Sequence, residues 1–299
     1  MKNILTENSN SKSTNIDLQN TTEILTIINS EDALVHQAVQ KAIPEITQAV
    51  DIITDSLLKG GRLAYFGAGT SGRLGVLDAS ECWPTFSFDK ERLKGYIAGG
   101  DYALRNSIEG AEDSQEEAIK DINDFSPTSQ DVVVGISASG NPQYVLTVLE
   151  KASQRGAKTI GITSNPQAKL ISLADISIIT QVGPEVITGS SRLKSGTAQK
   201  MVLNMLSTAS MIKIGKTYSN YMIDLKPVCS KLINRANHII SEICKIPVEI
   251  ADSYRIKGNN NVKLACVMYK KQCSLEEAQK LLTQHNGILR KVLNEDEKI

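Results

Sequence analysis

Hydrophobic and polar positions change their spacing along the chain, and these changes predict its elements. Residues 1–14 are mostly polar, and apolar residues spaced three and four apart begin after Asn20. We expect Ser30 to cap a second helix and Pro44 to interrupt it, and a third, amphipathic helix to end at Gly60-Gly61. Short apolar runs separated by helical stretches then predict buried strands at 63–66, 95–98, 132–136, 159–162 and 176–179.

Strands that alternate with helices are typical of an α/β fold, in which helices cover both faces of a parallel sheet. Beyond Asp224 the apolar spacing is helical throughout, and Ser274 with Glu277 forms a capping box. We therefore expect three parts: helices in 1–54, an α/β domain in 55–220 and a helical module in 221–299.

Composition and charge narrow the class of protein. Of 299 residues, 41% are hydrophobic, and 33 basic residues balance 33 acidic ones, which argues against a nucleic-acid partner. No apolar run reaches the roughly 20 residues of a membrane span, and residues 1–14 do not resemble a signal peptide, so we expect a cytoplasmic protein without a membrane partner. Five irregularly spaced cysteines and three scattered histidines predict no metal site.

Two hydroxyl-rich glycine loops follow predicted strands. The first, GAGTSGR at 67–73, contains the GxGxxG pattern, and the second, SASGNP, occupies 137–142. Because the carboxyl ends of parallel strands lie at one edge of a sheet, we expect these loops to converge and bind a phosphate. The alternative is that both loops only cap helices.

Acidic and basic clusters supply further candidate groups. Carboxylates at 78–81 and 109–114 could act as general acid and base near a bound phosphate, or could simply form solvated helix faces. A third hydroxyl- and glycine-rich segment, 182–197, includes Arg192 and Lys194 before an apolar helix. Its cations suit a second anion such as a carboxylate, and the alternative is capping with surface charge.

These clusters, in this order, resemble the N-acetylmuramic acid 6-phosphate etherases, bacterial members of the sugar isomerase (SIS) superfamily. The similarity covers nearly the whole chain, with its longest unbroken blocks at 67–75 and 189–200. The resemblance implies a SIS-type sandwich, in which helices flank a central parallel sheet, with an N-terminal helical arm and a small UBA-like helical module at the C-terminal end. A single SIS unit usually pairs with a second, so we also expect a homodimer.

The family reaction removes the D-lactyl ether from C3 of the sugar and gives N-acetylglucosamine 6-phosphate and D-lactate, in amino-sugar catabolism and cell-wall recycling. The resemblance implies that Glu81 protonates the lactyl oxygen and that Glu112 is the base for C2 or for water. A useful acid at neutral pH needs a raised pKa, so we expect Glu81 in the less polar environment. Neither a metal nor another cofactor is implied.

The resemblance also assigns binding residues for a sugar-phosphate substrate. We expect Arg192 and Lys194 to bind the lactyl carboxylate. The residues expected at the phosphate are Gly69, Thr70, Ser71, Ser137, Ser139 and Gly140.

The chain departs from the family pattern at two places near these groups. Trp83 stands where the family usually has proline, and Asn141-Pro142-Gln143 replaces a turn that is commonly Arg-Thr-Pro. Both departures could alter substrate contacts. Three other functions stay open: a non-catalytic sugar-phosphate regulator like the animal glucokinase regulatory protein, a ketose–aldose isomerase, and a nicotinamide-dependent dehydrogenase using GxGxxG.

Overall fold

The structure is a computed structural model that describes residues 7–293. The described chain folds into two compact units, one of residues 7–80 with 90–210 and the other of 81–89 with 211–293. Two long helices, α3 (Gly69–Phe86) and α7 (Lys194–Lys213), contribute residues to both units. None of the helices described is both long and apolar enough to span a membrane.

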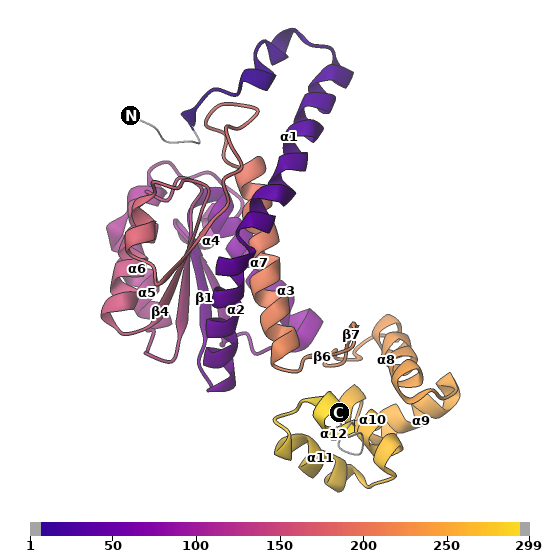
Figure 1. The fold of residues 1–299 in the computed structure, drawn as a ribbon. Helices are drawn as coiled ribbons and strands as arrows, with labels where there is room; N and C mark the ends of the chain where they lie inside the picture. Colours follow the sequence, from indigo (N-terminus) through magenta and orange to yellow (C-terminus); the bar gives the residue numbers. More distant parts are fainter. Residues whose placement is uncertain (1–6, 294–299) are drawn as a thin grey trace. The chain divides into compact units, whose positions relative to one another are not determined.

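The first unit is built on a five-stranded parallel sheet with the strand order β2-β1-β3-β4-β5 (Figure 1). The predicted α/β fold is confirmed, and each predicted strand is present to within two residues. β1 and β3 are buried along their whole length, as expected of central strands covered on both faces. The strands are β1 (Leu63–Gly67), β2 (Leu93–Ile97), β3 (Val132–Ile136), β4 (Lys158–Thr163) and β5 (Ile176–Ile179).

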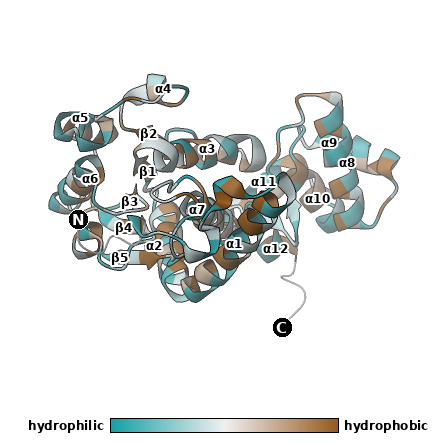
Figure 2. Cartoon of the chain, turned by 90° about the horizontal axis from the view of Figure 1, so that it is seen from above, coloured by the Kyte–Doolittle hydropathy of each residue, from teal (hydrophilic) through white to brown (hydrophobic). Residues whose placement is uncertain are grey.

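Helices cover both faces of this sheet, with α5 and α6 on one face and α2, α3 and α7 on the other (Figure 1). On the first face Phe66 of β1 stacks on Tyr96 of β2, with 4.6 Å between the ring centroids, and packs edge-on against Phe125 of α5. The outer sides of α5 and α6 are hydrophilic (Figure 2). The helices not yet given are α1 (Thr21–Lys41), α2 (Ile43–Leu58), α4 (Gly100–Ala103), α5 (Gln115–Phe125) and α6 (Gln143–Gln154).

The N-terminal helices differ from the prediction at one point. Asn20 and Glu23 form a capping box at the start of α1, which continues through Ser30 without a break. The expectation that Ser30 caps a second helix is wrong, because its hydroxyl donates to the carbonyl of Thr26 one turn earlier. Pro44 does mark a boundary, since it occupies the first turn of α2, where a missing N–H costs no helical hydrogen bond.

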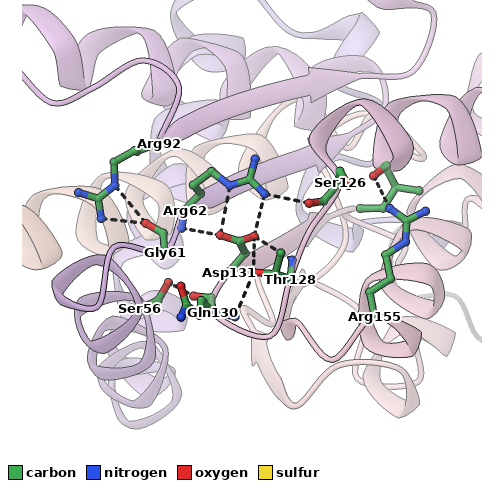
Figure 3. Close-up of polar contacts among 10 residues, drawn as sticks. Ser56, Gly61, Arg62, Arg92, Ser126, Thr128, Gln130, Asp131 and Arg155 are labelled. Atoms are coloured by element: carbon green, nitrogen blue, oxygen red, sulfur yellow. Dashed lines mark hydrogen bonds and ion pairs between the residues drawn. The ribbon is translucent and has the colours of Figure 1, made fainter.

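A closed polar network ties β1 to β3 at the edge where the strands begin (Figure 3). Asp131 is 2% exposed and accepts hydrogen bonds from the backbone N–H of Arg62 (2.7 Å), the Arg62 guanidinium (2.8 Å) and the N–H of Thr128 (2.8 Å). Burial raises the pKa of Asp131, but the hydrogen bonds from Arg62 and Thr128 outweigh it and hold that pKa below its usual range. Arg92 closes the same edge by donating to the carbonyl of Gly61.

The second unit is helical apart from a small antiparallel pair of strands, β6 (Thr217–Tyr218) and β7 (Tyr221–Met222), which was not predicted. The predicted apolar stripe lies on α8, whose Ala236, Ile239 and Ile240 are buried in the core of this unit. The predicted capping box at Ser274 is confirmed. The helices are α8 (Ser230–Cys244), α9 (Val248–Lys257), α10 (Val262–Lys271), α11 (Leu275–Gln284) and α12 (Leu289–Leu293).

Candidate active site

The two hydroxyl loops begin at paired positions of neighbouring strands. Gly67 at the end of β1 pairs with Ile136 at the end of β3, and the loops follow directly at 68–71 and 137–140. Both loops therefore start at the same edge of the sheet, which is where ligands bind in open parallel α/β sheets.

Glycines in the first loop allow helix α3 to start immediately beside β1. A Cβ on Gly72 would lie 2.6 Å from the Gly67 carbonyl oxygen, and one on Gly67 would lie 2.7 Å from the Gly72 nitrogen. Gly69 has a φ of +53°, in the left-handed region that favours glycine, and the space beside it is open. These three glycines thus serve close backbone approach and loop conformation.

The hydroxyls of the first loop differ in their surroundings. Thr70 is half-buried, and its hydroxyl makes no hydrogen bond within residues 7–293; its methyl group lies 3.5 Å from where a Cβ of Gly196 on α7 would be. Ser71 is 7% exposed, and its hydroxyl donates to Oε1 of Gln199 on α7 over 2.9 Å. This hydrogen bond joins residues 128 positions apart, and no local sequence pattern indicates it.

The second loop is held by hydrogen bonds within the loop and to residues 165 and 169. The Ser137 hydroxyl oxygen accepts a hydrogen bond from the Gly140 N–H over 3.0 Å, so its hydrogen is available to an acceptor outside the loop. Gly140 has a φ of +69°, and a Cβ there would lie 2.3 Å from the Ala168 side chain. The Ser139 carbonyl accepts from Asn165, while Asn141 accepts from the backbone N–H of Lys169. Asn141 therefore braces the loop in this chain.

Glu112 lies at the rim of a cavity of about 220 Å³ that also touches Gly69 of the first loop. Although Glu112 is exposed, partial burial of its carboxyl raises its pKa, and repulsion from Asp113 and Glu109 raises it further. A carboxylate with a raised pKa is a stronger base, which suits proton abstraction. The structure brings this candidate base next to the first loop.

Two charged side chains hold the segment that leads to Glu112. Arg73 of α3, which lines the same cavity, donates to the carbonyls of Ala103 (2.8 Å), Leu104 (3.1 Å) and Asn106 (2.9 Å). Glu117 of α5 accepts from the backbone N–H of Gly99 over 2.7 Å. Arg73 is the last residue of the glycine motif at 67–73, and this position is the only indication of its importance in the sequence. Its hydrogen-bond partners lie about 30 residues further along the chain.

Glu81, the expected acid, lies on α3 and belongs to the second unit, where its side chain is exposed. Glu81 and Glu112 are both exposed, and the expectation that Glu81 occupies the less polar environment stays a prediction. Asp78 is a buried carboxyl of α3, and it accepts hydrogen bonds from the side chains of Asn204 and Ser207 on α7. Burial raises the pKa of Asp78, and the hydrogen bonds from Asn204 and Ser207 oppose this increase.

The two cations expected at a substrate carboxylate have opposite surroundings. Arg192 is exposed, whereas Lys194 is 1% exposed, with its Nζ 2.6 Å from a carboxylate oxygen of Glu31. The first N–H groups of α7, those of Lys194 and Ser195, both donate to Glu185. These contacts favour a structural role for Lys194, and its binding to a substrate carboxylate stays a prediction.

Trp83, the other departure from the family pattern, lies near the end of α3 and belongs to the second unit, as does Lys226. The indole is 39% exposed, and the ammonium of Lys226 lies 5.2 Å from the ring centroid.

Within residues 7–293, no group of three or more His, Cys, Asp or Glu side chains is placed to hold a metal ion.

Comparison with known proteins identifies relatives of the whole chain. Two family models match parts of it, the glucokinase regulatory protein N-terminal SIS domain at 45–153 and the SIS domain at 119–209. The N-acetylmuramic acid 6-phosphate etherase of Escherichia coli O1:K1 / APEC is 47% identical over 99% of each chain. That of Geobacillus sp. (strain WCH70) is 48% identical over 98% of this chain and 99% of its own.

A solved structure, that of phosphoheptose isomerase from Neisseria gonorrhoeae, also matches. It is 18% identical, with a TM-score of 0.49, and the match covers 64% of this chain and 98% of the isomerase.

Proposed function

The chain belongs to the N-acetylmuramic acid 6-phosphate etherase family, and from that premise we propose that it is a carbon–oxygen lyase acting on N-acetylmuramic acid 6-phosphate. It cleaves the D-lactyl ether at C3 and gives N-acetylglucosamine 6-phosphate and D-lactate. The observation that carries this proposal is the cavity shared by Glu112 and the first hydroxyl loop, in a chain 47% identical to a named etherase along its whole length.

The residue types fit an elimination followed by addition of water. When the sugar ring is open, the aldehyde at C1 makes the C2 proton acidic, and Glu112 removes it. The C3–O bond breaks as Glu81 donates a proton to the lactyl oxygen, because an ether oxygen leaves poorly as an anion. Water then adds to C3 of the unsaturated aldehyde. One carboxylate takes a proton from this water, and a carboxylic acid gives a proton to C2.

The phosphate is bound at the edge where β1 and β3 end. Thr70, Ser71, Ser137 and Ser139 supply hydroxyl donors, and the left-handed Gly69 and Gly140 let the backbone approach closely. Among the described residues the Thr70 hydroxyl makes no hydrogen bond, and the Ser137 hydroxyl accepts one but donates none, and both observations support this assignment. Arg192, which is exposed, is assigned to the lactyl carboxylate.

A homodimer is the proposed assembly. The outer half of α1, residues 21–30, contains no buried position although it carries four Ile or Leu side chains, of which Leu25 is 60% exposed. Leu18, just before this helix, is 77% exposed. A second copy that covers these side chains would remove apolar surface from water. Substitution of Leu25 by Lys should shift the mass measured by light scattering from dimer to monomer; a monomeric wild type would contradict the proposal.

The test of the activity is D-lactate release from N-acetylmuramic acid 6-phosphate, with the unphosphorylated sugar as control. Release from the phosphorylated sugar alone, abolished in Glu81→Gln, is the expected result. Binding of the sugar phosphate without lactate release would instead favour a non-catalytic regulator, the reading that the match to the glucokinase regulatory protein domain would support.

A further inference from the structure

The two buried serines of the proposed phosphate site orient their hydroxyls differently. Ser137 accepts a hydrogen bond from the Gly140 N–H, which leaves its own hydrogen available to an acceptor. Ser71 instead donates its hydrogen inward, to Oε1 of Gln199. A phosphate oxygen accepts hydrogen bonds and cannot donate one when fully ionised, so Ser71 in this arrangement has no hydrogen to offer it.

Gln199 has the means to reverse this arrangement. Its side chain is 1% exposed, and its Nε2 has no hydrogen-bond partner among the described residues, although a buried amide N–H is normally paired. A half-turn of the amide brings Nε2 to Ser71, where it donates to the hydroxyl oxygen. The hydrogen of Ser71 is then released toward a ligand, as that of Ser137 already is.

We propose that Gln199 is a positioning residue for phosphate binding: it acts through Ser71, donating to its hydroxyl oxygen so that Ser71 donates to the substrate phosphate. The inference rests on the proposed function, because it takes the phosphate to lie at the first loop. Oε1 of Gln199 already lies 2.9 Å from the Ser71 hydroxyl oxygen, so rotation of the amide alone brings Nε2 to Ser71 without movement of the helix.

The test compares Gln199→Met, which keeps the length of the side chain but cannot hydrogen-bond, with Ser71→Ala and with the double variant. The readouts are KM and kcat for N-acetylmuramic acid 6-phosphate and the inhibition constant of inorganic phosphate. Gln199→Met should raise KM and the inhibition constant about threefold to tenfold, with kcat within about twofold of wild type. The double variant should bind no more weakly than Ser71→Ala alone.

Two further variants separate positioning from packing. Gln199→Glu keeps an acceptor for Ser71 but, when ionised, has no donor, so it should bind phosphate at least as weakly as Gln199→Met. Ser210→Ala changes a fully buried hydroxyl further along α7 that has no hydrogen-bond partner among the described residues, and it should leave both constants unchanged. The melting temperature of Gln199→Met should change little, because removal of the unpaired Nε2 offsets loss of the hydrogen bond that Oε1 accepts from Ser71.

The inference would be overturned if the effects of Gln199→Met and Ser71→Ala on KM multiplied in the double variant. It would also be overturned if phosphate inhibited Gln199→Met as strongly as wild type but inhibited Ser71→Ala more weakly. Failure of the proposed phosphate site has a different signature, since Ser71→Ala itself would then leave KM and phosphate inhibition unchanged.

Discussion

The two edges of the parallel sheet use polar residues in opposite ways. Where the strands begin, Asp131 and Arg62 satisfy one another and their neighbours in a closed network (Figure 3). Where the strands end, Thr70 makes no hydrogen bond within the described part of the chain and Ser137 keeps its hydrogen for an outside acceptor. The first edge therefore stabilises the fold, and the second is left ready for a ligand, so substitutions at the two should affect different measurements.

The largest effect is expected at the ligand edge, in Glu112→Gln. The amide keeps the size of the side chain but cannot accept the C2 proton, so kcat should fall about 10²- to 10⁴-fold. The melting temperature should stay near that of wild type, because Glu112 is exposed. Lactate release and thermal unfolding measure the two quantities, and an active Glu112→Gln would remove this residue from the mechanism.

Asp131→Ala should show the reverse pattern at the opposite edge. It leaves the Arg62 guanidinium and two backbone N–H groups without their shared acceptor, and we expect a loss of about 2–3 kcal/mol in the free energy of unfolding. Urea unfolding measures this loss. KM, determined under conditions where the variant is folded, should be unchanged; a raised KM would mean that the two edges are coupled.

The carboxylate of Asp131 should also make the stability of the fold depend on pH in the acidic range. Because the pKa of Asp131 is lower in the folded chain than in the unfolded one, its contribution to stability is fully present above the unfolded pKa, about 3.9. That contribution is lost as the pH falls through the lower, folded pKa. Asp131→Asn should therefore lose less stability than the wild type between neutral pH and strongly acidic pH, as urea unfolding at each pH would measure. An equal loss in the two proteins would contradict this.

Arg73→Met should give an intermediate effect, on catalysis rather than binding. Loss of its three hydrogen bonds frees the segment before Glu112, and a base displaced by about 1 Å can lower the rate by up to 100-fold. We expect kcat to fall about 10- to 100-fold with a smaller change in KM. Arg73→Lys, which retains one donor group, should recover part of the activity; no recovery together with poor folding would indicate a purely structural role.

Ser71→Ala should have the smallest effect. Loss of one net hydrogen bond to phosphate, worth about 1.4 kcal/mol, raises KM about tenfold and leaves kcat nearly unchanged. Steady-state kinetics on the phosphorylated sugar measure both constants. If KM stayed at its wild-type value, the phosphate would have to be bound elsewhere.

The sheet and its loops could be predicted from the sequence because their signals are local. Buried strands such as 132–136 are continuous apolar runs, and the left-handed Gly69 and Gly140 lie in recognisable glycine loops. The ion pair of Lys194 with Glu31 could not be predicted from the sequence, because only the folded chain brings together these residues, which lie 163 positions apart. The contact between Ser71 and Gln199 is non-local in the same sense.

The helix starts and the carboxylates show a second limit. Ser30 has the residue type of a cap, yet it lies inside α1 because the capping box at Asn20 starts the helix earlier. The pKa of Glu112 depends on partial burial at the cavity rim and on Asp113 and Glu109, which side-chain type alone does not reveal. The sequence therefore identifies the candidate side chains, but their burial and their charged neighbours are known only from the structure.

A crystal structure of the protein with N-acetylglucosamine 6-phosphate bound tests the central claim most directly. The account predicts that the phosphate oxygens lie about 3 Å or less from the hydroxyls of Thr70, Ser71, Ser137 and Ser139, with Gln199 donating to Ser71. A phosphate bound away from the edge where β1 and β3 end would contradict it.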